Sequence, residues 1–130
     1  MKDIKVCKFG GTSMATRESI NRVIDIVSAD DRRKFVIVSA PGKRNKCDIK
    51  VTDQLYKIVE EQKTTGNFKA SFDALKERFV SLTKELGVDF DIISELDNLE
   101  KAIANGATAS YAASRGEYLS AKLLSAKTGW

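Results

Sequence analysis

An α/β fold, in which a parallel β-α-β unit is followed by a helix-rich second half, is the fold class that this sequence predicts. Two apolar segments near the N-terminus flank a segment in which apolar residues recur with the spacing of one helix face. From about residue 52 onward, the apolar residues follow that helical spacing throughout. A strand-helix-strand unit of this length implies a right-handed parallel crossover, because the twist of the strands favours that hand.

The β-α-β unit comprises two strands and one helix. The first strand is expected at residues 3–9, where apolar and polar residues alternate. A helix should follow from about Thr16 to Ser28, because its apolar residues recur at i, i+3, i+4 and i+7. Position 19 is Ser where a capping box has Glu, so no capping box is expected to fix the start of this helix. The continuous, β-branched segment at residues 35–38 predicts a second strand that is buried on both faces.

Four helical segments make up the rest of the chain. The first begins near Thr52 and breaks at Gly66, and the second ends at Gly87. The third stops at Asn105-Gly106, and the last runs from about Ala109 to Lys127. The second and third of these segments carry regular apolar seams, which indicate that the two helices pack antiparallel. The seams consist of Phe72, Leu75, Phe79, Leu82 and Leu86 in one segment and Ile92, Leu96, Leu99 and Ile103 in the other.

Composition excludes several classes of protein. With 130 residues, of which 42% are hydrophobic and 31% charged, the chain is expected to form one globular domain. The net charge of +4 comes from lysines scattered among acids, which argues against nucleic-acid binding. No apolar run approaches membrane-spanning length and no signal peptide is evident, so we expect a cytoplasmic protein with no membrane partner. Cys7 and Cys47 lack CxxC spacing and histidine is absent, so neither a metal site nor a disulfide framework is expected.

The turn between the first strand and the first helix, residues 8–13, contains the features of a phosphate site. Gly10 and Gly11 allow the backbone to approach a ligand closely, and unpaired N–H groups at the start of the following helix favour an anion. Lys8 adds a positive charge, and the hydroxyls of Thr12 and Ser13 add donors. The segment matches neither G-x-x-x-x-G-K-[ST] nor G-x-G-x-x-G. The alternative interpretation is a tight glycine turn without a ligand.

Two later segments also carry candidate residues. Pro41 to Lys46 follows the second strand, where doubly wound sheets bind ligands, but a solvated basic loop is the favoured interpretation for each of its cations. In the last helix, none of the four residues that share a face with Glu117 is basic, so no ion pair within the helix can hold this carboxylate. Glu117 is therefore either a ligand-binding group or a surface glutamate. Arg115 lies about 200° around the helix from Glu117 and is expected to make a structural or other contact.

Three ordered motifs together resemble the aspartokinases of the amino-acid kinase superfamily. They are Lys8-Phe9-Gly10-Gly11-Thr12-Ser13, Val36-Ile37-Val38-Ser39-Ala40 with Gly42, and Ser114-Arg115-Gly116-Glu117 with Ser120-Ala121. The resemblance implies the N-terminal part of a three-layer αβα sandwich. Because the chains of that family are roughly three times as long, residues 1–130 are expected to be a single partial domain. It would be the substrate-binding half of the catalytic domain, with the nucleotide half and the regulatory domains absent and no activity on its own.

The same resemblance implies a role for each site residue. Lys8 would neutralise charge on the transferred phosphoryl group and act in catalysis. Gly10, Gly11 and Ser13 would hold the phosphates of ATP. Ser39 and Ala40 would line the substrate pocket, and Glu117 would bind the amino group of aspartate. Thr52 would contact the substrate's α-carboxylate, although it lies ten residues after Gly42, in a loop longer than the family's.

The implied reaction is phosphoryl transfer from ATP, with Mg²⁺, to the side-chain carboxylate of L-aspartate. This is the first step in the biosynthesis of the aspartate family of amino acids, and the family resemblance also implies a homo-oligomer. No general base is needed, because a carboxyl group with a pKa of about 3.9 is already an anion at neutral pH. The alternative is a non-catalytic helical binding module that retains the phosphate-binding loop.

Overall fold

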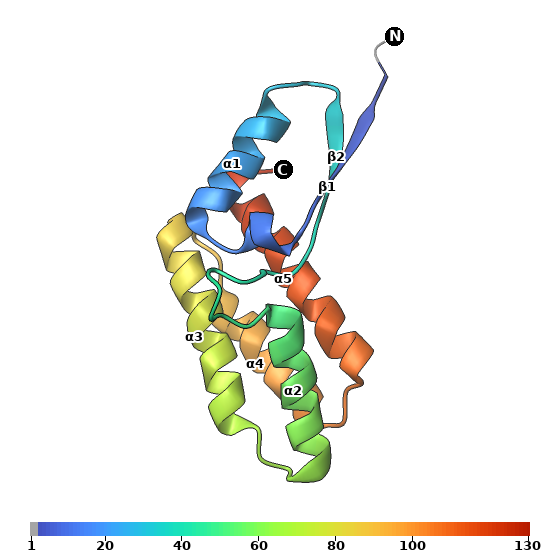
Figure 1. Ribbon diagram of the computed structural model, residues 1–130, viewed down its shortest axis with the longest axis vertical. Helices are drawn as coiled ribbons and strands as arrows, with labels where there is room; N and C mark the ends of the chain where they lie inside the picture. The colour runs from blue at the N-terminus through green and yellow to red at the C-terminus, as the bar shows by residue number, and fades with distance from the viewer. Residues whose placement is uncertain (1–2) are drawn as a thin grey trace.

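The computed structural model describes residues 3–130, and its element order confirms the predicted fold class (Figure 1). A parallel β-α-β unit comes first, followed by helices alone. The elements are β1 (Lys5–Phe9), the 3₁₀ turn η1 (Gly11–Met14), α1 (Arg17–Ser28), β2 (Arg33–Val38), α2 (Val51–Thr64), α3 (Lys69–Leu86), α4 (Ile92–Ala104) and α5 (Ala109–Thr128). No helix among the described residues is long and apolar enough to cross a membrane.

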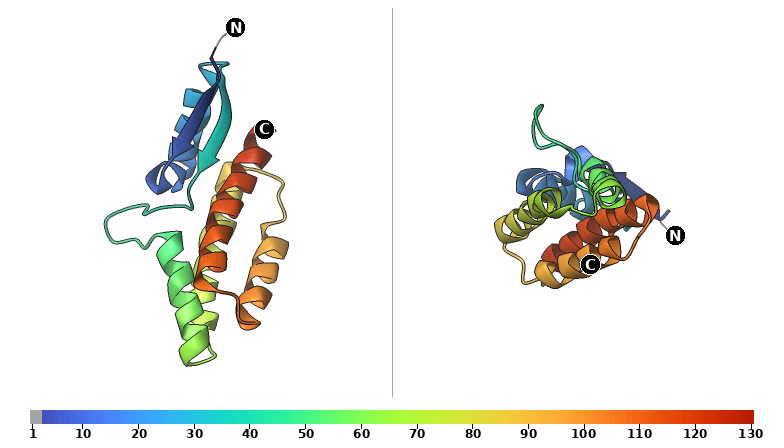
Figure 2. Two further views of the ribbon diagram at one scale, coloured as in Figure 1. Left: turned by 90° about the vertical axis from the view of Figure 1, so that its right-hand side faces the viewer. Right: turned by 90° about the horizontal axis from the view of Figure 1, so that it is seen from below.

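Only one face of the two-stranded sheet is covered, so the prediction of a second strand buried on both faces is wrong. Val38 is 8% exposed, and Phe9 and Val36 also pack against the core on the side where α1 and α5 lie. On the opposite face, Val6 pairs with Phe35, and these side chains are 64% and 59% exposed. No element among residues 3–130 covers that second face. In the left view of Figure 2, the uncovered strands lie in front of α1.

The start of α1 is fixed by a capping box, contrary to the expectation from the sequence. The Ser19 N–H donates to Thr16 Oγ1 at 3.1 Å, and the Thr16 N–H donates to Ser19 Oγ at 3.1 Å. Ser19 is short but buried beneath the turn, so its hydroxyl reaches the backbone as the side chain of a Glu does in the usual motif. Caps of this kind typically contribute about 1 kcal/mol, and this one places the first helical residue at Arg17.

Helices α2 to α5 form a bundle whose apolar interior is continuous with the core side of α1 and β2. Phe72, Leu75 and Phe79 of α3 are at most 1% exposed, as are Leu96 of α4 and Leu123 of α5. Successive helices run in opposite directions, which confirms the antiparallel packing of α3 and α4 (Figure 1). The predicted end of α3 is confirmed as well, because Gly87 adopts a left-handed conformation with φ of 68° after Leu86.

Candidate functional site

The turn after β1 leaves both a cation and backbone donors available. Lys8 is exposed at the end of the strand, and its ammonium makes no hydrogen bond or ion pair with any residue from 3 to 130. The following turn is closed by a hydrogen bond from the Ser13 N–H to the Gly10 carbonyl at 3.1 Å. Gly11 and Thr12 occupy the first positions of a 3₁₀ turn, where an N–H group has no acceptor within the turn.

This geometry corrects the expected source of the donors. The sequence suggested that they would come from the start of the following helix, which was expected at about Thr16. That helix begins only at Arg17, and its capping box engages the amide of Ser19. The amides next to Lys8 therefore belong to the 3₁₀ turn rather than to the α-helix.

Gly10 and Gly11 are glycines for different reasons. Gly10 has an extended conformation, with φ of −76° and ψ of 178°, that any residue can adopt. A Cβ atom added to it would meet nothing within 4 Å, so no packing among the described residues requires glycine there. A Cβ on Gly11, by contrast, would lie 3.1 Å from the Ala40 carbonyl oxygen and 3.1 Å from the Gly42 Cα. Gly11 is needed for close packing, whereas Gly10 leaves an open approach to the backbone.

The loop after β2 packs directly on this turn. The Gly42 N–H donates to the Gly11 carbonyl at 2.8 Å, and the Ser39 N–H donates to the Phe9 carbonyl at 3.0 Å. A Cβ on Gly42 would lie 2.6 Å from the Gly11 carbonyl carbon, closer than real side chains come. The first two sequence motifs are therefore in backbone contact with each other.

The third motif joins them through α5. A Cβ on Gly116 would lie 2.9 Å from the Ala40 Cβ and 3.2 Å from a methyl group of Val51. The glycine of the Ser-x-Gly-Glu motif thus allows α5 to cross closely over the loop after β2 and the start of α2. Glu117, the next residue, is exposed and has no hydrogen bond or ion pair within residues 3–130.

The neighbours of Glu117 in the motif make local contacts. The Ser114 hydroxyl donates to the Tyr111 carbonyl of its own helix at 2.6 Å. Arg115 lies against two aromatic rings, with its guanidinium carbon 4.5 Å from the centroid of Tyr118 and 5.2 Å from that of Tyr111. This cation–π contact agrees with the structural role expected for Arg115.

Thr52 lies closer to the other site residues than its place in the sequence suggests. The loop leaves β2, swings outward and returns to the start of α2, as both views of Figure 2 show. At its return, the Val51 N–H donates to the Pro41 carbonyl at 3.0 Å. Thr52 is the next residue, half-buried, and its hydroxyl makes no hydrogen bond within residues 3–130. The ten-residue separation from Gly42 is thus largely closed in space.

Within the loop, Arg44 pairs with an acid rather than remaining a free cation. Its Nε donates to Asp48 Oδ2 at 2.6 Å, and its backbone N–H donates to the same oxygen at 2.9 Å. These hydrogen bonds hold the pKa of Asp48 well below its usual range. Lys43 and Lys46 are exposed, as the interpretation of a solvated loop requires.

Arg78 is connected to the site but was not predicted from the sequence. Arg78 of α3 is 5% exposed and donates to the carbonyls of Gly42 and Ile49, the latter at 2.9 Å. Burial lowers the pKa of its guanidinium. A signal was present, because Arg78 follows Leu75 by three residues and so lies on the apolar face of the helix.

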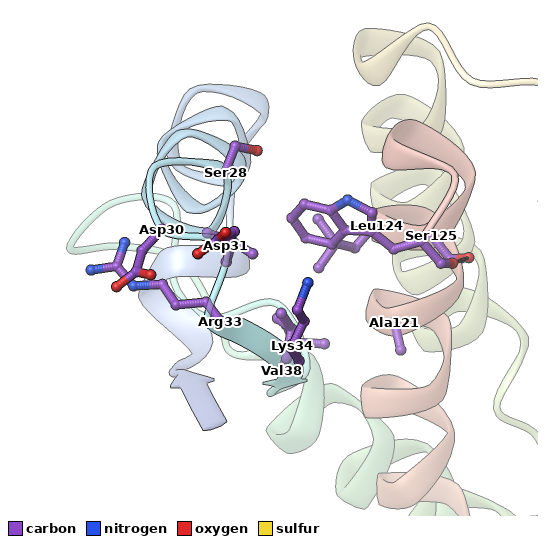
Figure 3. A pocket seen from close by; sticks show the side chains of 12 residues that line it. Ser28, Asp30, Asp31, Arg33, Lys34, Val38, Ala121, Leu124 and Ser125 are labelled. Carbon is purple, nitrogen blue, oxygen red and sulfur yellow. Dashed lines mark hydrogen bonds between the residues drawn. The ribbon is translucent and has the colours of Figure 1, made fainter. Parts of the chain in front are cut away.

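A hollow of about 580 Å³ lies between β2 and α5 (Figure 3). It is bounded by the turn between α1 and β2, by β2 itself and by the C-terminal half of α5. Charged side chains such as Asp30 and Lys34 line it together with the apolar Val38 and Leu124. None of the site residues predicted from the sequence lines it. Among the described residues, no group of three or more Cys, Asp or Glu side chains could hold a metal ion.

Comparisons with known proteins place these motifs in a family. A family model described as the amino acid kinase family matches residues 3–128. Aspartokinase 3 of Bacillus subtilis (strain 168) is 40% identical over 93 residues, which cover 72% of this chain and 20% of that protein. The chain therefore spans about a fifth of the length of this curated relative, and 21% of the aspartokinase of Chlamydia trachomatis.

Solved structures show the same fold. The aspartate kinase of Clostridium acetobutylicum superposes with a TM-score of 0.93 at 40% identity, over 98% of this chain and 30% of that one. Escherichia coli aspartokinase III, in complex with aspartate and ADP, superposes with a TM-score of 0.76 at 25% identity. That match covers 96% of this chain and 28% of the E. coli chain.

Proposed function

This chain belongs to the amino acid kinase family, and we propose that it supplies the phosphate-binding turn and the acceptor-binding residues of an aspartokinase. The proposed reaction transfers the γ-phosphoryl group of ATP to the side-chain carboxylate of L-aspartate, forming 4-phospho-L-aspartate. This would be the first step of aspartate-family amino-acid biosynthesis. Support comes from the similarity to aspartokinases and from the aspartate and ADP bound to the E. coli relative.

The observation that carries this proposal is the meeting of three separate motifs at one point. Gly42 donates a hydrogen bond to Gly11, and Gly116 packs on Ala40 too closely to accommodate a side chain. Two charged groups lie in the motifs that meet here, Lys8 near the end of β1 and Glu117 on α5, and neither has a hydrogen bond or ion pair within residues 3–130. A cation and an anion held apart on one junction suit two substrates, of which one carries a phosphate and the other an ammonium group.

We assign the residues as follows. Lys8 neutralises charge on the transferred phosphoryl group, while the amides of Gly10 and Gly11 and the hydroxyl of Ser13 hold phosphate oxygens. The open space around Gly10 fits this role, because a ligand can reach the backbone there. ATP bound with Mg²⁺ supplies the phosphoryl group. The chain's own contribution is to hold two anions together and to offset their charge.

The acceptor is held by the other two motifs. Glu117 accepts hydrogen bonds from the ammonium group of aspartate, which offers three donors. Ser39 and Ala40 line the pocket, and the hydroxyl of Thr52 donates to the α-carboxylate. The side-chain carboxylate of aspartate attacks as an anion above its pKa of about 3.9, so no residue has to remove a proton.

We further propose that the 130-residue chain binds ligands but does not turn over by itself. It covers 30% of the C. acetobutylicum enzyme, and a phosphoryl transfer site needs contacts to the whole nucleotide. We also propose that the chain functions within a homo-oligomer in the cytoplasm. A non-catalytic helical binding module is the second candidate, favoured by the large share of the buried core that helices α2 to α5 supply.

Isothermal titration of the chain with aspartate, glutamate and ATP tests the proposal. Glu117→Gln keeps the shape of the side chain and removes its charge, so the affinity for aspartate should fall by roughly 1.5–3 kcal/mol, or about 10- to 150-fold. The affinity for ATP should stay unchanged. Glu100→Gln, on the exposed surface of α4, makes the same charge change and serves as the control.

Two results would count against the function. Equal losses of affinity for both ligands in the Glu117 variant would show that Glu117 is structural. A wild-type chain that binds ATP but neither amino acid, together with no aspartate-dependent ADP release from the full product of its gene, would favour the binding module.

A further inference from the structure

The starting point is a buried charge that the proposed reaction does not use. Arg78 has 5% of its surface exposed and lies on the apolar face of α3, between Leu75 and Leu82. Taking a guanidinium out of water is costly unless hydrogen bonds compensate it, and an apolar residue could occupy this position without that cost. The contacts of Arg78 therefore indicate what the charge contributes.

Those contacts tie together the two ends of one loop. One terminal nitrogen of Arg78 donates to the Gly42 carbonyl, and the other donates to the Ile49 carbonyl at 2.9 Å. The carboxylate of Asp48 approaches within 4.0 Å of the same guanidinium and pairs with Arg44 on its outer side. The planar fork of an arginine can hold two carbonyls in a fixed geometry, which a lysine cannot.

The clamped residues are next to the candidate site residues. Gly42 donates its N–H to Gly11 and accepts from Arg78 through its carbonyl, so holding the carbonyl restrains the residue that packs on the phosphate-binding turn. At the other end, Ile49 lies two residues before Val51, whose N–H donates to Pro41 and which precedes Thr52. Arg78 itself is 5% exposed, and its hydrogen bonds go to these two loop carbonyls rather than to a candidate site residue.

We propose that Arg78 is a positioning residue that clamps the loop of residues 42–49 and so holds the junction of Gly11 and Gly42 in its binding geometry. The clamp is a property of the fold alone. Its consequence for aspartate binding rests on the proposed function. Without the clamp, the pair of Arg44 and Asp48 still holds the loop residues to one another, but the loop loses its fixed position over the turn.

Nuclear magnetic resonance of the wild-type chain gives the first test. A guanidinium held by two carbonyls cannot rotate freely, so the Nη–H groups of Arg78 should give separate, slowly exchanging signals. The exposed Arg17 should give averaged signals under the same conditions. Averaged signals for Arg78 would overturn the proposal without any variant being made.

Hydrogen exchange in Arg78→Lys and Arg78→Met gives the second test. We expect the amides of Gly42 and Val51 to exchange at least tenfold faster in both variants, while the amides of α5 in Arg78→Lys change less than twofold. Arg44→Gln, which alters the outer side of the loop, should leave the Gly42 amide protected. Uniform acceleration of all amides, or no change at Gly42 and Val51, would contradict a positioning role.

A ligand measurement then separates this proposal from the proposed function. In the full product of the gene, Arg78→Lys should raise the KM for aspartate at least tenfold and lower kcat less than threefold. If the wild type has no aspartate-dependent activity, the proposed function fails while hydrogen exchange still decides the clamp. If the wild type is active and Arg78→Lys has an unchanged KM, the clamp has no part in binding.

Discussion

In the helical half of this molecule Leu75, Phe79 and Leu123 are completely buried, whereas on the open face of the sheet Val6, Phe35 and Ile37 keep more than half of their surface exposed. The same types of residue therefore have different roles in the two regions. Helices α2 to α5 bury their apolar faces against one another and supply most of the fully buried side chains. The β1–β2 region contributes Lys8 and the glycine turn, and it retains an apolar surface suited to another layer of protein.

The largest effect on stability is expected in the bundle. Phe79→Ala removes a completely buried ring and leaves a cavity, so the free energy of unfolding should fall by about 3–5 kcal/mol. Urea denaturation followed by circular dichroism measures this loss. Phe35→Ala removes the same side chain from the open face of the sheet, where it is 59% exposed.

Phe35→Ala is thus the matched control for the two regions. Its free energy of unfolding should change by no more than about 0.5 kcal/mol, as for most surface substitutions. Light scattering should show weaker self-association than in the wild type, because an exposed apolar patch favours contact between chains. A loss of several kcal/mol in Phe35→Ala would contradict the division of the molecule into two regions.

Lys8→Ala should reverse the pattern seen with Phe79→Ala, by affecting activity and leaving stability unchanged. In the full product of the gene, losing one contact to the transition state should lower kcat by about 10²–10³-fold. The midpoint of urea denaturation should stay the same, because the Lys8 side chain is exposed and makes no ion pair within residues 3–130. Wild-type kcat in this variant would rule out the phosphate role of Lys8.

Substitutions of Gly42 and Gly10 test the junction at which the loop after β2 packs on the turn after β1. Gly42→Ala places a Cβ 2.6 Å from the Gly11 carbonyl carbon and 2.8 Å from the Thr12 nitrogen, so it should destabilise the chain by about 1–3 kcal/mol. Gly10→Ala meets nothing within 4 Å and has a suitable φ, so its stability should not fall. Its affinity for ATP should fall, because the new methyl group occupies the open approach to the backbone.

Thermal denaturation measures the stability of Gly10→Ala and Gly42→Ala, and titration with ATP measures the nucleotide affinity of Gly10→Ala. Equal stability losses in Gly10→Ala and Gly42→Ala would show that the open space at Gly10 has another structural use. Unchanged ATP affinity in Gly10→Ala would argue against the glycine turn as the phosphate site.

The smallest effect concerns acid stability at the far end of the sheet. Asp30 accepts hydrogen bonds from Arg32, at 2.8 Å, and from Lys5, at 2.9 Å, and these bonds hold its pKa well below the usual range. A lowered pKa in the folded state stabilises the protein above the unfolded pKa of about 3.9, and this contribution disappears as the pH falls further. Asp30→Asn should therefore be less stable than the wild type at pH 7.

The difference in the free energy of unfolding between the wild type and Asp30→Asn should shrink as the pH is lowered from 6 to 3. Urea denaturation at several pH values measures it. A difference that is the same at pH 7 and pH 3 would show that the charge of Asp30 is not responsible.

Local signals in the sequence were sufficient for most elements. The helical spacing of Leu75, Phe79 and Leu82 predicted both the existence of α3 and its buried face. Gly87 predicted its end, since a left-handed residue is most easily a glycine. The prediction that no capping box starts α1 was wrong. The hydroxyl of Ser19 replaces a Glu in this motif because the geometry of the turn brings it within reach of the backbone.

The candidate site was predicted in part. The positions of Gly10, Gly11, Ser39, Ala40 and Glu117 came from motifs, and contacts in the structure bring those motifs together. Their roles in binding remain predictions. Arg78 could not be assigned, because a charged residue on an apolar face has many possible partners and the sequence does not indicate which one it meets.

The sequence by itself determined the order and type of the strands and α-helices, because apolar spacing and glycine conformations act over a few neighbouring residues. Only the tertiary structure decided which face of the sheet stays open and why Gly11, Gly42 and Gly116 have no side chains. These properties depend on contacts between residues far apart in the chain, such as Arg78 and Gly42, which are 36 positions apart. No local pattern specifies such a partner, since it is the packing of α3 against the loop that brings the two together.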